Sequence, residues 1–99
     1  MTENYQALGE HTAYIEQAKD AAQRRFGALY NAAHQLRQRA ERVEDPLDVQ
    51  TLKDMLDACA AADREMRAAL ERANQAGALC GRPEVKLSYL NREWRDLPR

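Results

Sequence analysis

The 99-residue sequence has little of what enzymes and ligand-binding folds usually need. It contains only four glycines, three prolines, one tryptophan and two cysteines. So few turn-forming residues leave room for long helices and few irregular loops, where active sites are usually built. It also lacks the GxSxG, HExxH, P-loop and GxGxxG motifs. We therefore predict a protein that is not an enzyme and that binds no cofactor, metal or small-molecule ligand.

Its cysteines and histidines are too dispersed to form a metal site. Cys59 and Cys80 are 21 residues apart, and His11 and His34 are 23 residues apart on one predicted helix. Two thiols without a secretory signal favour a reducing, cytoplasmic setting. No apolar run approaches the roughly 20 residues of a membrane span. We expect a soluble cytoplasmic protein with no membrane partner.

The chain also lacks a charge excess of either sign, since its formal net charge is −1. A general nucleic-acid binder would be basic. One basic flank keeps a small nucleic-acid-associated regulator as an alternative. It consists of Arg24, Arg25, Arg37, Arg39 and Arg42. Arginine outnumbers lysine 12 to 3 and there are 18 alanines, which is typical of a GC-rich genome and suggests a bacterial or phage source.

Alanine, leucine, glutamate, glutamine and arginine dominate the sequence, as in long helices and coiled coils. In the first segment, apolar residues recur in two rows whose spacing alternates between three and four, as in a coiled-coil seam. The rows are Leu8, Ile15, Ala22, Leu29, Leu36 and Val43, and Tyr5, Thr12, Lys19, Phe26, Ala33 and Ala40. Only Thr12 and Lys19 are polar, and Thr2 or Asn4 could cap the start. This pattern predicts one helix over about residues 3–44.

The sequence EDPLD at residues 44–48 stops this helix and starts another. Pro46 disfavours helical geometry at Asp45, and Asp45 can cap a new helix in which Pro46 is the first residue. Gly77 is suited to a C-cap, so we predict a second helix over about 46–76. Such a short connection makes the two helices an antiparallel hairpin.

The second helix carries more apolar rows than one partner helix can cover. Its predicted seam is Val49, Leu52, Leu56, Cys59, Asp63, Met66, Leu70 and Ala73. We expect Leu36 to lie opposite Leu56 in the hairpin. A second row remains, namely Met55, Ala62, Ala69 and Ala76. It predicts a homodimer that forms a four-helix bundle, a fold-back of residues 82–99, or a foreign partner. Asp63 either lies in water at the edge of the seam or fixes the register, for example by accepting a hydrogen bond from Tyr30.

We divide the chain into the hairpin, residues 1–81, and a C-terminal amphipathic segment, residues 82–99. The segment either belongs to the same domain or is a docking tail. Val85, Leu87 and Tyr89 alternate as in a strand, whereas the row from Leu87 to Leu97 has helical spacing. We predict an extended lead and a helix over about 88–97.

The function that this shape suits best is protein–protein interaction by helix-face docking, as an adaptor, a chaperone-like binder or an inhibitor. The partners would be a second copy and another protein. A second alternative is a structural assembly element in which dimer contacts use every apolar row. The predicted interface residues are Met55, Ala62, Met66, Ala69, Ala76, Tyr89, Leu90, Trp94, Arg95 and Leu97.

Overall fold

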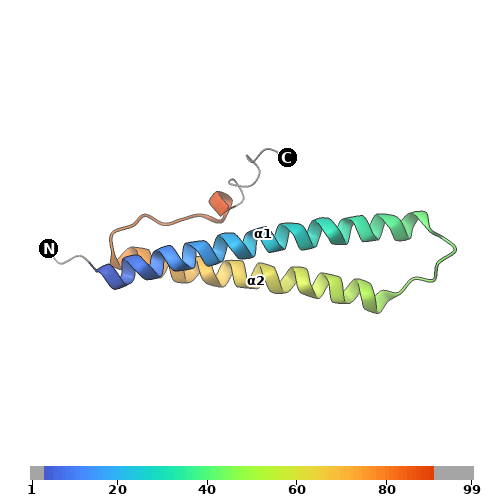
Figure 1. The fold of residues 1–99 in the computed structure, drawn as a ribbon, viewed down its shortest axis with the longest axis horizontal. Coiled ribbons are helices and arrows are strands. Elements are labelled where there is room, and N and C mark those ends of the chain that lie inside the picture. The colour runs from blue at the N-terminus through green and yellow to red at the C-terminus, as the bar shows by residue number, and fades with distance from the viewer. Residues whose placement is uncertain (1–3, 91–99) are drawn as a thin grey trace.

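The computed structural model describes residues 4–90 and shows the predicted all-α antiparallel hairpin (Figure 1). Helix α1 spans Tyr5–Glu41 and helix α2 spans Val49–Leu79. Residues 82–86 are extended and residues 87–90 form a helical turn. Within residues 4–90 there is no strand. The predicted ranges of 3–44 and 46–76 were close, but both ends of α2 need correction.

Helix α1 begins with a side-chain cap. The side-chain oxygen of Asn4 accepts a hydrogen bond from the backbone N–H of Ala7 at 3.0 Å. This bond satisfies one of the first-turn N–H groups that have no partner within the helix. Asn4, one of the two predicted candidates, is thus the residue that caps α1.

Helix α2 begins later than predicted, because Asp48 and not Asp45 is its N-cap. The Asp48 carboxylate accepts from the Thr51 backbone N–H at 3.2 Å and from its hydroxyl at 2.6 Å. The Thr51 hydroxyl bond, followed by the backbone bond, lowers the pKa of Asp48. Pro46 therefore stays in the connection, where its missing N–H costs no helical hydrogen bond.

Helix α2 also continues past Gly77, which is not its C-cap. Its C-cap is Cys80, and the next residue is Gly81, whose φ of +76° lies in the left-handed region. The Arg82 N–H donates to the Gly77 carbonyl at 2.8 Å, as in a Schellman motif. Gly77 itself is buried, and a Cβ there would lie 2.8 Å from Cδ2 of His11. Its role is to let the two helices approach closely.

The seam between the helices matches the predicted rows only in part. Leu29, Leu36 and Leu56 are exposed, whereas other predicted members are buried, namely Ala22, Cys59, Met66, Leu70 and Ala73. The buried residues of α1 are Ala7, Ala18, Ala21, Ala22 and Ala32, and those of α2 include Cys59, Ala62, Met66, Ala69, Ala73 and Ala76. On α1 four of the buried alanines lie one position before a predicted seam residue, whereas Ala22 belongs to the predicted row. On α2 the seam contains the row that we expected to be left over. Small side chains allow close packing of the axes, so the alanine rows meet and the bulkier rows lie at the flank.

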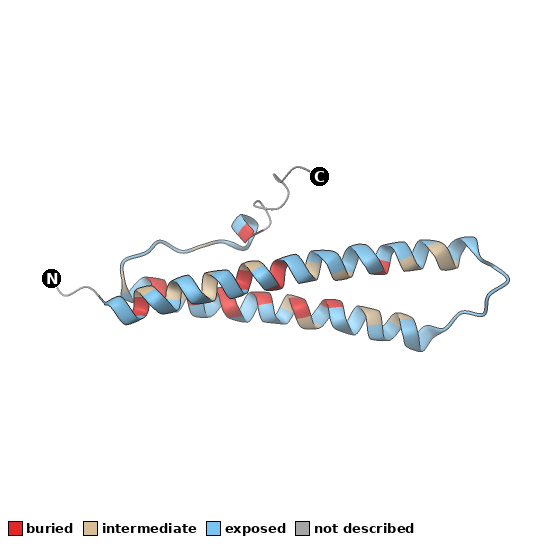
Figure 2. Cartoon of the chain, in the orientation of Figure 1, coloured by how far each residue is buried: buried red, intermediate tan, exposed pale blue. Residues whose placement is uncertain are grey.

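The core is concentrated in the half of the hairpin that is far from the connection (Figure 2). Its main cluster joins both helices to the returning C-terminal segment. The members are Ala18, Ala21, Ala22, Met66, Ala69, Leu70 and Leu90, with Ile15 and Val85 packed against them. In this half of the hairpin, α1, α2 and the C-terminal segment all contribute apolar contacts. Elsewhere in the described residues, only α1 and α2 do so.

Candidate partner-binding surface

One face of the hairpin is covered by the chain's own C-terminal segment. After α2 ends, residues 82–90 turn back and run along the hairpin toward its middle (Figure 1). Leu90 is only 1% exposed, and Val85 also packs against the cluster. The segment covers Ile15 and Ala22 of α1 and Leu70 of α2. The described part of the C-terminal segment thus folds back, as one of the sequence alternatives predicted.

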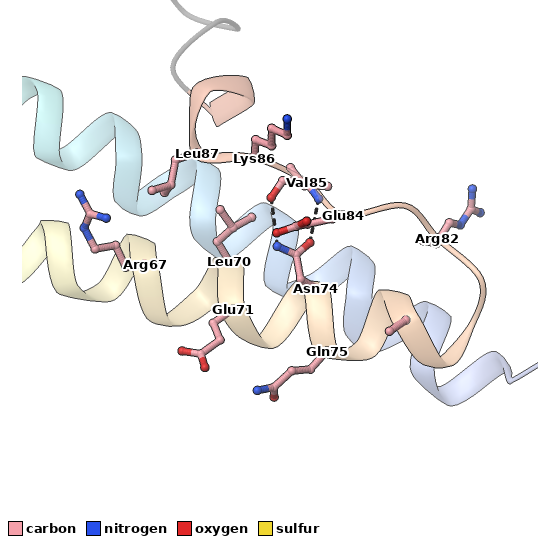
Figure 3. A pocket seen from close by; sticks show the side chains of 11 residues that line it. Arg67, Leu70, Glu71, Asn74, Gln75, Arg82, Glu84, Val85, Lys86 and Leu87 are labelled. Atoms are coloured by element: carbon pink, nitrogen blue, oxygen red, sulfur yellow. Dashed lines mark hydrogen bonds between the residues drawn. The ribbon is translucent and has the colours of Figure 1, made fainter.

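The segment is held to α2 by Asn74. The Asn74 amide N–H donates to the carbonyl of Val85 at 3.0 Å, and its oxygen accepts from the Val85 N–H at 2.8 Å (Figure 3). A single side chain therefore satisfies both backbone groups of Val85, in the way that a neighbouring strand would. This clamp fixes the extended residues over the hairpin.

A shallow groove of about 820 Å³ lies between α2 and the segment. Its charged side chains include Arg67 and Lys86 and also Glu71 and Glu84 (Figure 3). Ligand sites are usually largely apolar with a few converging polar groups. Because the groove carries both positive and negative side chains, it favours neither an anionic nor a cationic ligand. It is therefore a weaker candidate binding site than the apolar face described next.

Asp63 lies where the part of the hairpin face that residues 82–90 cover comes to an end. Its carboxylate accepts from Arg25 at 2.8 Å across the hairpin and from Arg67 at 2.9 Å along α2. The bonds from Arg67 and Arg25 lower the pKa of Asp63. Asp63 therefore pairs between the helices, which favours the register-fixing interpretation, but its partner on α1 is Arg25 and not Tyr30.

Beyond Asp63, bulky apolar side chains on the same face are exposed. Leu29, Leu36 and Leu56 have 39%, 45% and 50% of their surface accessible. Arg25 lies level with Asp63, so one heptad further toward the connection Leu56 is level with Ala32 of α1. We call Leu29, Leu36 and Leu56 the open face. Such a patch on one side of a small domain is typical of an interaction site.

The aromatic residues beside the open face form a stacked pair. The rings of Phe26 and Tyr30 have centroids 6.2 Å apart and an interplanar angle of 22°. Aromatic pairs at this separation are mutually stabilising. They border the open face on α1, next to Leu29.

The predicted interface residues lie largely elsewhere. Ala62, Met66, Ala69 and Ala76 are buried between α1 and α2, and Met55 is half-buried. Leu90 belongs to the returning segment itself and is buried in the core. Tyr89 remains exposed, with the Lys19 ammonium 5.9 Å from its ring centroid. Trp94, Arg95 and Leu97 lie outside the described residues.

The arginine flank of α1 is partly neutralised by α2. Arg24 forms ion pairs with Glu65 at 2.6 Å and Asp20 at 3.1 Å, and these bonds, the Glu65 bond first, raise the pKa of Arg24. Arg25 pairs with Asp63, and Arg39 donates to Gln35. Arg37 and Arg42 are exposed. The flank is thus a mixed surface in which acidic residues face two of the five arginines.

No protein-family model, curated protein or solved structure matches this chain. Across residues 4–90, no three histidine, cysteine or acidic side chains are grouped where they could hold a metal ion. Neither described helix is long and apolar enough to cross a membrane.

The open face was missed because its leucines were placed in the hairpin seam. Leu36 and Leu56 were expected to bury each other, yet both are exposed. The sequence did contain a competing signal, since Ala18, Ala21, Ala28 and Ala32 repeat at three-, seven- and four-residue intervals beside the leucine row. An alanine row of this kind competes for the seam because it permits the closest helix approach.

Proposed function

We propose that this protein is a non-enzymatic protein–protein interaction module that docks a partner on its open face. The observation that carries the proposal is the exposure of Leu29, Leu36 and Leu56 on the face that is covered at its other end. Apolar area removed from water contributes roughly 25 cal/mol per Å². A complex in which a partner covers these three leucines is therefore stabilised by apolar burial that the isolated hairpin lacks.

The covered end indicates how such a partner would bind. There, Val85 and Leu90 insert apolar side chains over the edge between α1 and α2, while the backbone runs along the hairpin axis. A partner segment with apolar side chains at helical or alternating spacing would lie along the open face in the same manner. An adaptor, a chaperone-like binder and an inhibitor would all use this mode of docking.

The alternatives have less support. Phosphate binding through the arginine flank would have to break the ion pairs of Arg24 with Glu65 and of Arg25 with Asp63. A structural assembly element would use the same open face, with self-association as its whole function. Cys59 and Cys80 are free thiols, which supports the proposal of a reducing, cytoplasmic setting.

Site-specific photo-crosslinking in cells tests the proposal. A photo-reactive amino acid replaces Leu36 of the full chain, and the matched control carries it at Asn31, which is exposed on the same helix but away from the open face. We expect a discrete protein adduct from position 36 and none from position 31. Equal labelling from both positions, or no adduct from position 36, would contradict the proposal.

A further inference from the structure

Helix α1 carries a second heptad row, which includes Leu29 and Leu36 of the open face. Its members are Leu29, Ala33, Leu36 and Ala40, at spacings of four, three and four, and all four are exposed. The row is about 17 Å long at ~1.5 Å per residue. Spacing of this kind keeps a row in contact with one neighbouring helix over its whole length. It is therefore a packing surface for a helix and not a scatter of surface leucines.

The two rows of α1 lie on adjacent sides of the helix. Ala28 and Ala32 belong to the row that packs on α2, and Leu29 and Ala33 follow each of them by one residue. One residue is a rotation of about 100°. A helix in a four-helix bundle contacts two neighbours in this way. In the loop half of the hairpin, α1 contacts α2 and carries a second row of the kind that a further helix would cover.

We propose that the further helix is α1 of a second copy, packed antiparallel about a twofold axis between residues 34 and 35. This inference rests on the proposed function, whose partner it names. The arrangement places Leu36 against Ala33 of the partner subunit, and Leu29 against Ala40 of the partner subunit. The four layers that Leu29, Ala33, Leu36 and Ala40 form then each hold one leucine and one alanine, so a single distance between helix axes suits all four. A parallel pair would alternate leucine–leucine and alanine–alanine layers, which require different distances.

The distribution of charge favours the same orientation. Residues 26–36 contain no aspartate, glutamate, lysine or arginine, whereas residues 37–45 contain Arg37, Arg39, Arg42, Glu41, Glu44 and Asp45. The antiparallel pair sets the charged residues 37–42 of each copy against the uncharged residues 27–32 of the other. A parallel pair would set Arg37 beside Arg37 of the partner subunit, and like charges in contact are unfavourable. The interface is thus complementary to itself in both shape and charge.

Helix α2 extends this interface from one side. Leu56 is level with Ala32 of α1 and hence close to the proposed twofold axis. Two hairpins joined in this way form a four-helix bundle over their loop halves only. The contact is short, so we expect a dimer that forms with rising concentration and not an obligate one.

Light scattering of the full chain under reducing conditions, over a concentration series, tests the inference. We expect the mass to rise from the 11.3 kDa of one chain to twice that value. Leu36→Glu should raise the dissociation constant at least about a hundredfold, because two carboxylates would enter an apolar contact. Asn31→Glu is the matched control and should still dimerise. Circular dichroism should show equal helix content in both variants. A wild-type monomer at every concentration would overturn the inference, as would a dimer of Leu36→Glu.

Exchanging the two side chains tests the antiparallel pairing. Leu36→Ala creates alanine–alanine layers and Ala33→Leu creates leucine–leucine layers, so each should weaken the dimer by about tenfold or more. The double variant restores one leucine and one alanine per layer and should regain most of the wild-type affinity. A double variant weaker than both single variants would overturn this pairing.

The crosslink from position 36 separates this inference from the proposed function. An adduct of twice the chain mass supports both. An adduct with a different protein supports the proposed function and overturns the dimer. A link to residues 91–99 of the same chain also overturns the dimer. The absence of any adduct contradicts both.

Discussion

The two halves of the hairpin use the same two helices and bury very different amounts of them. In the half far from the connection, Leu70, Met66 and Leu90 lie in a core of three layers. In the loop half, the buried residues among those described are Ala32, Cys59 and Ala62, while Leu29, Leu36 and Leu56 are exposed (Figure 2). The difference lies in residues 82–90, which cover one half and not the other.

This comparison shows what two alanine-rich helices can and cannot do for each other. Alanines allow the helices to meet closely but supply little apolar area, and hydrophobic stabilisation is roughly proportional to that area. The leucines lie at the flank of the seam, where only a third layer covers them. The covered half has that layer within the chain, and we propose that the loop half obtains it from another chain.

Truncating one leucine in each half should give the largest contrast. Leu90→Ala removes a side chain that is 1% exposed, and we expect a loss of about 2–4 kcal/mol in the free energy of unfolding. Leu36→Ala should cost less than about 0.5 kcal/mol in dilute, monomeric protein, because that side chain is already exposed. Urea unfolding followed by circular dichroism measures both. Equal losses would mean that the two halves do not differ in burial as described.

Removing the clamp at Asn74 should give the next largest effect. Asn74→Ala loses two hydrogen bonds and leaves both backbone groups of Val85 without their partner. We expect a loss of about 2 kcal/mol, at roughly 1 kcal/mol for each bond. Hydrogen exchange should also become faster at residues 82–90 and stay unchanged in the loop half. The neighbouring Gln75→Ala is the control, and an equal loss there would contradict a clamp at Asn74.

The helices, their order and the hairpin could be predicted from the sequence, because heptad spacing and the residues around Pro46 are local signals. The residues of the seam could be predicted only in part. The rows of Ala28 and Leu29 on α1 are both regular, and hydropathy favours the leucine row. The choice between them depends on how closely the helices approach and on what covers the leucines, which are both tertiary effects.

For the same reason, the sequence predictions of the partner-binding surface and of the hairpin seam were partly interchanged. Ala62 and Ala69 were predicted to be an interface and are buried in the seam, whereas Leu36 and Leu56 were predicted to be in the seam and are exposed. Asp63 was identified as a residue that could fix the register. Its choice of Arg25 over Tyr30 depends on side-chain geometry that spacing does not specify.

Replacing a glycine by alanine should change the free energy of unfolding in opposite directions in the two halves. At Gly27, in the loop half, a Cβ meets no atom within 4 Å, and alanine should stabilise the helix by about 1 kcal/mol. At Gly77, a Cβ would lie 2.8 Å from Cδ2 of His11. Crowding costs about 1–3 kcal/mol and exceeds the gain in helix propensity, so we expect a net loss of about 1 kcal/mol.

A double variant checks the cause of that loss. Once His11→Ala has removed the ring, Gly77→Ala should be neutral or stabilising, as Gly27→Ala is in the wild type. Thermal or urea unfolding of the four combinations gives the coupling between the two sites. If Gly77→Ala is equally harmful without the ring, close contact with His11 is not the reason for glycine at this position.

The smallest expected effect concerns Asp63, which stands at the border between the halves. Its bonds from Arg67 and Arg25 hold the pKa of the carboxyl below its usual value in the folded state. A lowered folded-state pKa contributes stability above the usual carboxyl pKa, and that contribution disappears as the pH falls through the folded-state value. Asp63→Asn should therefore lower the Tm slightly at neutral pH, and the difference from wild type should vanish in acid. The exposed Asp57→Asn serves as the control, with no such convergence expected. A difference at Asp63 that persists unchanged into acid would show that the ion pairs are not its cause and that the boundary between the covered and open halves does not depend on them.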